Sequence, residues 1–207
     1  MKNQLSLRGL REILLPPPGV GESLDTPGGP ARAAFGPIPG SVAGRRGRDL
    51  VVFLGQVALF EDLGRGDLER LAQNAHERSY GDAERIYEQG KPGAALFIVR
   101  SGVVEIARRG RGGEEVPLVT LEPPASFSEQ EAMGAEAVRW TSAIARGPVS
   151  LVAFGSSDLD ALGRRFPHLA NKILRKLAQI MALRLQMLID VHFSTEEAEV
   201  PTGDHQT

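Results

Sequence analysis

Between Tyr80 and Gly155, the sequence repeats one short pattern that limits the folds available to it. Apolar and polar residues alternate over short runs, which is typical of half-buried strands, and a glycine or proline lies in nearly every gap. Six runs follow one another: RIYEQG, AALFIVRSG, VVEIARRG, EEVPLVTLE, WTSAIARG and VSLVAFG. Strands at this short spacing predict a compact β-barrel or roll rather than a sheet in which strands and helices alternate.

Helical patterns flank these strands on both sides. Before them, DLVVFLGQVALFEDL is apolar, and GRGDLERLAQNAHERSY places a cap candidate, Asp67, ahead of an apolar face. After them, SSDLDALGRRF begins with serines, and Pro167 starts a second helix with a wide apolar stripe. We therefore expect an α+β fold, in which N-terminal helices and two C-terminal helices flank an antiparallel β-roll of the double-stranded β-helix or jelly-roll kind.

The ends of the chain differ in composition from this middle region. Residues 1–15 predict a short amphipathic helix, which three consecutive prolines end. Residues 16–48 are rich in Pro, Gly and Arg without any period, and predict a disordered linker. The domain is expected over residues 49–192, followed by a disordered acidic tail at 193–207.

Composition excludes several classes of function. The chain has 207 residues, and its net charge of −2 argues against nucleic acid as the main partner. It has no cysteine, so disulfides and thiolate metal sites are impossible, and a cytoplasmic location fits. No apolar run is long enough to span a membrane. The four histidines lack metal-ligand spacing, and no catalytic constellation is present, so we expect neither an enzyme nor a metal site.

One stretch, PPASFSEQEAMGAEAVRWTSA at residues 123–143, combines residue types that suit an anion. Glu129 stands at the start of a helix-forming run, and Arg139 follows it. A guanidinium gives strong, charge-assisted hydrogen bonds to a phosphate, whereas a carboxylate accepts from a hydroxyl group. Taken singly, residues of these types more often belong to a solvated polar connection between two strands than to a ligand site.

Three segments together resemble the cyclic nucleotide-binding domain family, of the catabolite activator and protein kinase A regulatory-subunit type. They are VALFEDL, the segment EQGKPGAALFIVRSGVVEI with glycines at 90 and 102, and the stretch at residues 123–143. The resemblance implies that cAMP or cGMP is the ligand, with no other cofactor. It implies that Glu129 accepts from the ribose 2′-hydroxyl, that Arg139 binds the phosphate, and that four more residues line the ligand: Phe127, Ser128, Trp140 and Thr141.

The chain departs from the family pattern at several neutral positions. Ser128 stands where the family has glycine, and it would be strained if that position needs a positive φ. Pro124 and Ala83 also replace glycines, and Trp140 replaces a small residue. Leu188 and Ile189 stand where the family carries hydroxyl residues that read an adenine edge.

These departures leave two functions open. The first is a cytoplasmic regulatory protein that binds a cyclic nucleotide and signals through its C-terminal helix or a protein partner. The second is a degenerate domain that no longer binds nucleotide and serves as an interaction or dimerisation module.

The wide apolar stripe of the last helix also suggests a homodimer, in which the helix pairs with its twin. We expect that contact to use Ile173, Leu177, Ile180 and Leu188, and a further protein partner could bind through residues 1–15. Because only an acidic, polar stretch follows the last helix, we expect a stand-alone domain without a DNA-binding module.

Overall fold

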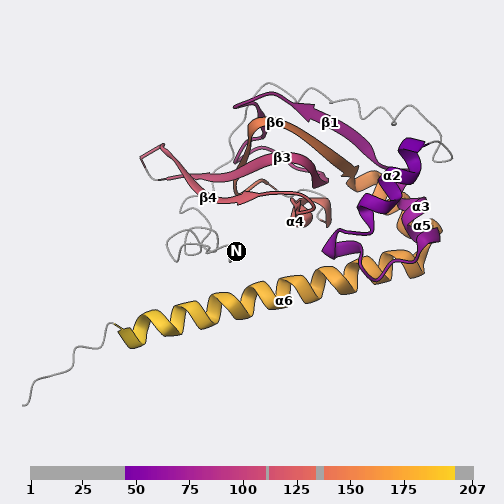
Figure 1. Cartoon of the computed structure of the whole chain (residues 1–207). Helices are drawn as coiled ribbons and strands as arrows, with labels where there is room; N and C mark the ends of the chain where they lie inside the picture. Colours follow the sequence, from indigo (N-terminus) through magenta and orange to yellow (C-terminus); the bar gives the residue numbers. More distant parts are fainter. Residues whose placement is uncertain (1–44, 111, 134–137, 199–207) are drawn as a thin grey trace, which may run out of the picture.

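The computed structural model describes residues 45–110, 112–133 and 138–198 (Figure 1). Within these ranges, the side chains of residues 45, 46, 131, 133, 187, 188 and 190–198 are not described. The predictions for residues 1–15 and for most of the linker therefore lie outside the described residues. Helix α2 begins at Arg45, ahead of the predicted domain boundary at Asp49, and the last helix continues to Ala198, into the predicted tail.

The centre of the molecule is a six-stranded antiparallel sheet, as the alternating pattern predicts. The main path runs β1-β6-β3-β4, while β2 pairs with β6 and β5 pairs with β3. The strands are β1 (His76–Tyr80), β2 (Arg85–Tyr87), β3 (Ala95–Arg109), β4 (Glu115–Leu121), β5 (Ser126–Phe127) and β6 (Ser142–Gly155).

Two long strands shape the roll, and each contains two of the predicted runs. The predicted turn at Gly102 bends β3 instead of ending it: φ is +84° there, and a Cβ would collide with the carbonyl oxygen of Pro148. Gly147 in β6 also has a positive φ, and the β3–β6 register shifts twice between Val99 and Val103. Strands β3 and β6 therefore stay continuous and paired on both sides of the bend.

The helices gather at one end of the roll and beneath it (Figure 1). Helices α2, α3 and α5 lie together at that end, and α6 runs below the sheet, with α4 between them. Their bounds are α2 (Arg45–Leu54), the 3₁₀ turn η1 (Ala58–Phe60), α3 (Arg65–Ala72), α4 (Glu129–Met133), α5 (Ser156–Arg165) and α6 (Pro167–Ala198). The fold is α+β, an antiparallel β-roll flanked by N-terminal and C-terminal helices, so the predicted fold class is confirmed.

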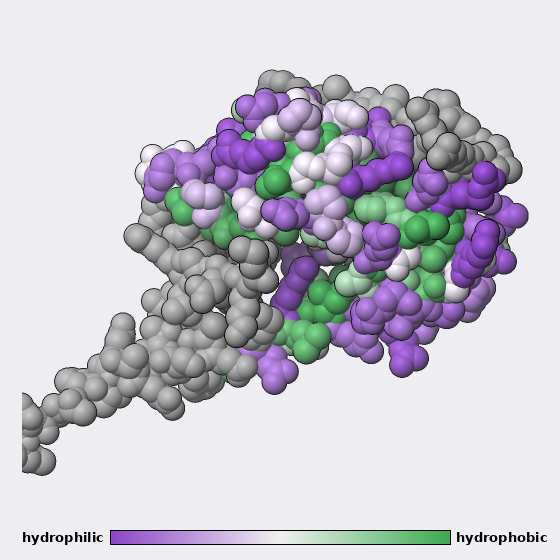
Figure 2. All heavy atoms as spheres, viewed as in Figure 1, coloured by the Kyte–Doolittle hydropathy of each residue, from purple (hydrophilic) through white to green (hydrophobic). Residues whose placement is uncertain are grey.

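Strand alternation divides the core in two. In β3, Leu96 and Ile98 face the helices, whereas Phe97 and Val99 face the interior of the roll. In Figure 2, hydrophilic atoms cover most of the visible roll, and hydrophobic atoms gather where the roll meets the helices. The roll interior therefore stays a separate apolar compartment, and β5 brings Phe127 into it.

Helix α6 uses its apolar stripe first to pack on its own domain. Ile173 is 6% exposed and belongs to the helix-side core, so the prediction that Ile173 contacts a second copy is wrong. Leu177 and Ile180 are half-buried against the same core. Leu188 has no described side chain.

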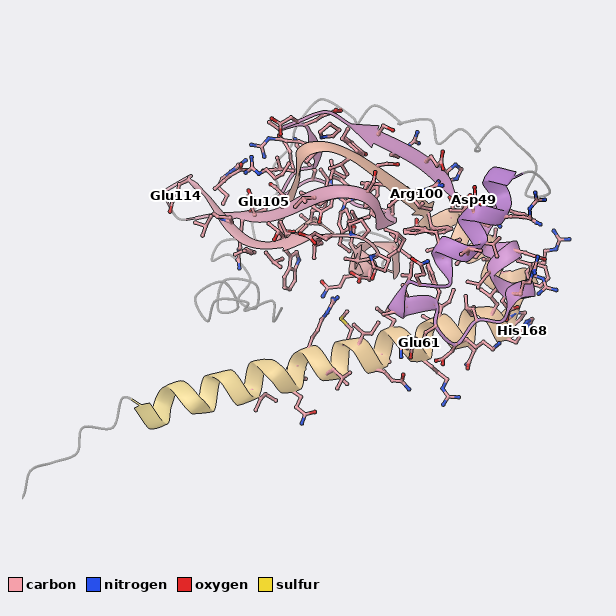
Figure 3. All side chains as sticks on the ribbon, in the orientation of Figure 1. Asp49, Glu61, Arg100, Glu105, Glu114 and His168 are labelled. Atoms are coloured by element: carbon pink, nitrogen blue, oxygen red, sulfur yellow. The ribbon has the colours of Figure 1, made fainter. Side chains whose placement is uncertain are left out.

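Ion pairs also join the first turns of α6 to Asp67 in α3 and to Glu61 at the end of η1. Figure 3 shows Glu61 directly beside α6, where it pairs with Lys176, and His168 at the start of the helix. Over the described residues, no helix is both long enough and apolar enough to cross a bilayer.

Candidate functional site

The predicted anion-binding stretch lies against the first residues of β3. Phe127 and Ser126 pair with Phe97 and Ile98, and the Val99 N–H donates to the carbonyl oxygen of Ala125 at 2.9 Å. Phe127 is buried, and its ring stacks on Phe97 with 5.3 Å between centroids. An aromatic residue at this position thus fixes the chain just before the charged residues.

Ser128 occupies the backbone conformation that favours glycine. Its φ is +66°, and the only other non-glycine residue with a positive φ in the described part of the chain is Ala83, at +60°. Both stand where the family resemblance expects glycine. An L-residue in this region costs on the order of 1–2 kcal/mol, so both positions retain a turn that their side chains disfavour.

Arg139 comes from the far end of the same stretch and docks on the loop before β3. Its N–H donates to the carbonyl oxygen of Lys91 at 2.9 Å, and its own carbonyl oxygen accepts from the Gly90 N–H at 2.8 Å. The side chain passes over Gly93, where an added Cβ would lie 2.8 Å from Cζ. Arg139 is only 6% exposed.

Three groups fix the buried guanidinium. Nη1 donates to Ser128 Oγ at 2.7 Å, and Cζ lies 3.8 Å from the centroid of the Tyr87 ring. Phe97 is the third group, with its centroid 5.8 Å from Cζ. A cation over an aromatic face contributes about 0.5–2 kcal/mol, more when it is desolvated. The guanidinium therefore lies between a hydroxyl group and the rings inside the roll.

Glu129 is buried as well, at 5% exposed, and it begins α4. Its Oε1 accepts from Ser126 Oγ at 2.8 Å and lies 3.5 Å from Nη2 of Arg184, which comes from α6. The carboxylate therefore links the predicted anion-binding stretch to the C-terminal helix.

The structure thus brings Phe127, Ser128 and Arg139 into one cluster, with Glu129 next to it in the chain. Thr141 is half-buried at the start of the following segment, and Trp140 is 47% exposed. Trp140 is therefore not a core residue.

Four residues near this site were not predicted: Tyr87, Gly93, Ser126 and Arg184. Gly93 belongs to the family-like segment EQGKPGAALFIVRSGVVEI. This position needs a small residue because the Arg139 side chain packs over it. Arg184 interrupts the apolar stripe of α6, which is the one sequence signal that could have marked it. Tyr87 and Arg139 lie far apart in the sequence, and no local spacing connects them.

Chemically, the site pairs a buried cation with a buried carboxylate. A guanidinium can bind an anion, and a carboxylate can accept a hydrogen bond from a hydroxyl group. In the part of the chain that is described, no three His, Asp or Glu side chains gather as a metal site would require.

Comparison with known proteins identifies relatives of this region. The family model for the cyclic nucleotide-binding domain matches residues 77–166. The cyclic AMP receptor protein of Thermus thermophilus is 34% identical over 128 residues, which are 62% of this chain and 57% of that protein. Glutaminase 2 of Bradyrhizobium diazoefficiens is 30% identical over 134 residues, which are 65% of this chain and 20% of that protein.

Among solved structures, the crystal structure of the Thermus thermophilus catabolite activator protein superposes with a TM-score of 0.59. Its sequence is 31% identical, and the match covers 68% of this chain and 63% of that one. The chain thus matches just over half of the receptor protein and a fifth of the glutaminase.

Proposed function

Residues 77–166 belong to the cyclic nucleotide-binding domain family, and on that premise we propose that the chain is a regulatory protein that binds cAMP or cGMP. Arg139 binds the cyclic phosphate, and Glu129 accepts from the ribose 2′-hydroxyl. Phe127, Ser128, Trp140 and Thr141 line the ligand. The domain is not catalytic, and its place is the cytoplasm, which its lack of cysteine supports.

The observation that carries this proposal is the burial of both charged residues beside one strained turn. Arg139 and Glu129 are 6% and 5% exposed, although charged side chains are almost never this buried unless they are paired or used. A cyclic nucleotide presents one anionic phosphodiester and a ribose hydroxyl, which suit a buried cation and a buried carboxylate from one stretch of the chain.

Arg184 supports an output through α6. A ribose hydroxyl that donates to Glu129 would share or replace the contact with Arg184, which lies at 3.5 Å. Ligand binding would then change the free energy of the α6 contact, which is the differential interaction that a population shift requires.

We also propose that α6 joins two copies, although not through Ile173. Among the described side chains of this helix, the exposed large apolar ones are Leu174, Leu183, Leu185 and Ile189. Leu174 and Leu185 lie eleven residues apart in the sequence and thus on one side of a helix. Sedimentation of wild type and Leu185→Glu tests this: we expect a dimer and a monomer, and equal masses would contradict it.

Calorimetric titration with cAMP, cGMP and 5′-AMP tests nucleotide binding directly. We expect saturable heat with at least one cyclic nucleotide below high-micromolar concentration, and weaker binding of 5′-AMP. Wild-type protein that releases no heat with either cyclic nucleotide would end the proposal.

A second candidate function is an interaction module that has lost nucleotide binding. Ser128 at a positive φ and the exposed Trp140 favour it. It predicts no heat with any nucleotide and a protein partner bound through residues 1–15 or α6. The same titration separates the two functions.

A further inference from the structure

Two uncharged side chains contact the guanidinium of Arg139 closely. Ser128 Oγ accepts from Nη1 at 2.7 Å, and the Tyr87 ring lies under Cζ at 3.8 Å. Ser128 and Arg139 are both buried, so water competes weakly for this hydrogen bond. The ring comes from β2, whereas the hydroxyl group and the guanidinium lie at two ends of the stretch at residues 123–143, so their meeting is a feature of the folded roll.

The hydroxyl of Ser128 comes at a cost in backbone energy. A glycine would adopt the observed φ of +66° without strain, so the serine disfavours its own turn. A side chain that persists in such a conformation is held there by its surroundings, and strain of this kind clusters at ligand sites. The contact that Ser128 gains in return is the hydrogen bond from Arg139.

The geometry of a guanidinium allows this hold to persist when a ligand binds. Arginine has five N–H donors in a fixed fork, and Ser128 uses one of them. A fork whose plane is already fixed loses less rotational freedom when it binds two oxygens of an anion. Tyr87 restricts the plane from one face, and the close approach to Gly93 restricts the stem.

We propose that Ser128 and Tyr87 are positioning residues that orient the Arg139 guanidinium for the phosphodiester, so that affinity depends on two uncharged side chains. This inference rests on the proposed function, because it assumes that Arg139 binds the phosphate. The inference gives a function to Ser128, which stands where the family has glycine. It also gives a function to Tyr87, which no sequence pattern marks.

Matched substitutions separate the hydroxyl from the backbone. Ser128→Ala and Ser128→Gly both remove the hydroxyl, but only glycine relieves the positive φ. We expect both variants to bind cyclic nucleotide about tenfold more weakly, which is the size of one hydrogen bond to a charged group. Ser128→Gly should melt at a higher temperature than Ser128→Ala. Weaker binding by the alanine variant alone would assign the effect to the backbone and overturn the proposal.

Tyr87 offers a conservative rescue. Tyr87→Leu removes the ring and should weaken binding about three- to tenfold, whereas Tyr87→Phe keeps the ring and should stay within about threefold of wild type. Equal losses in the two variants would show that the ring face does not position Arg139.

A double-mutant cycle tests whether Ser128 acts through Arg139. In an Arg139→Lys background there is no planar fork to orient, so Ser128→Ala should lower affinity by less than about threefold instead of about tenfold. An undiminished loss in that background would mean that Ser128 acts independently of Arg139.

A measurement without ligand keeps the inference testable if the proposed function fails. The Nε–H resonance of Arg139, identified by its loss in Arg139→Lys, should be displaced by the Tyr87 ring in wild type and should move in Ser128→Ala and Tyr87→Leu. If wild-type protein binds neither cyclic nucleotide, the proposed function is wrong. This resonance alone then decides whether Ser128 and Tyr87 orient the Arg139 guanidinium. An unmoved resonance, or wild-type affinity in both Ser128 variants, overturns the inference.

Discussion

Asp67 in α3 and Glu129 in α4 are carboxylates buried to nearly the same degree, 7% and 5% exposed, yet their partners differ. Asp67 meets basic side chains from two helices: Arg70 at 3.1 Å, His168 at 3.2 Å and Lys172 at 3.0 Å. Glu129 meets one hydroxyl group, Ser126, at 2.8 Å, and one guanidinium, Arg184, at 3.5 Å.

The electrostatics of Asp67 follow from these partners. Burial alone would raise the pKa of Asp67, but the hydrogen bonds and charges of Lys172 and His168 outweigh burial and hold the pKa below its usual value. Asp67 is thus a structural anchor that joins α3 to the start of α6. A carboxylate accepts about four hydrogen bonds, so the two contacts of Glu129 leave capacity for a ligand. Equal burial therefore does not imply equal function.

The largest expected effect is on binding, from Arg139→Ala. Removing one partner of a buried charged contact costs about 2–5 kcal/mol, so affinity for cyclic nucleotide should fall at least about thirtyfold in a calorimetric titration. Arg146→Ala removes an exposed arginine of β6 and serves as the control, with unchanged affinity. If Arg139→Ala still binds cyclic nucleotide with wild-type affinity, the ligand site does not lie in the stretch at residues 123–143.

The next largest effect is expected on the free energy of unfolding, from the substitution Asp67→Asn. Because Lys172 and His168 are partly exposed, solvent weakens these pairs, and we expect a loss of about 1–2 kcal/mol in the free energy of unfolding by urea at pH 7. Nucleotide affinity should be unchanged. Glu69→Gln breaks only an exposed pair with Arg65 in the same helix and should change stability by less than about 0.5 kcal/mol.

The pH dependence of Asp67→Asn sharpens this prediction. The folded-state pKa of Asp67 is lowered, so its contribution is present above the ordinary pKa of 3.8 and is lost as the pH falls through the folded value. The stability gap between wild type and Asp67→Asn should therefore narrow below about pH 4. A gap that stays constant down to pH 2 would contradict the role of charge.

Glu129→Gln should show the reverse of Asp67→Asn. The amide keeps an acceptor for Ser126 but loses the charge, so cyclic nucleotide binding should weaken about tenfold, by the loss of one charge-assisted hydrogen bond. The free energy of unfolding should change by less than about 1 kcal/mol. If stability falls as far as in Asp67→Asn while affinity is unchanged, the two carboxylates have the same role.

The smallest effect is expected from Arg184→Gln. Its pair with Glu129 is partly exposed and is worth no more than about 1 kcal/mol. Hydrogen exchange in the middle of α6 should rise slightly without ligand, and the change on adding nucleotide should shrink. Arg175→Gln, which alters an exposed arginine of the same helix, should leave both unchanged.

The strands and turns of this fold were largely predictable because their signals are local. Alternating residues marked β3 and β6, and the glycines predicted at turns, 90 and 102, both have a positive φ. The strain expected at Ser128 is present. The prediction that HERSY belongs to a helical segment is wrong: α3 ends at Ala72, and these residues form β1, which has no alternation and is defined by its pairing with β6.

The surroundings of the charged residues could not be predicted in the same way. Arg139 and Glu129 were recognised from a resemblance, but Tyr87 and Arg184 reach them from distant segments. Contacts of this kind depend on how the roll closes and where α6 crosses it. Ile173 shows the same limit, since an apolar stripe does not say which of its residues face the chain's own core.

One measurement tests the contrast between the two carboxylates and the central claim together: thermal melting of wild type, Asp67→Asn and Arg139→Ala, each with and without saturating cAMP or cGMP. Ligand that binds only the folded state raises the melting temperature. We predict a ligand-induced rise in wild type and in Asp67→Asn, the latter from a lower starting temperature, and a much smaller rise in Arg139→Ala. An equal rise in Arg139→Ala, or no rise in wild type, would contradict the account.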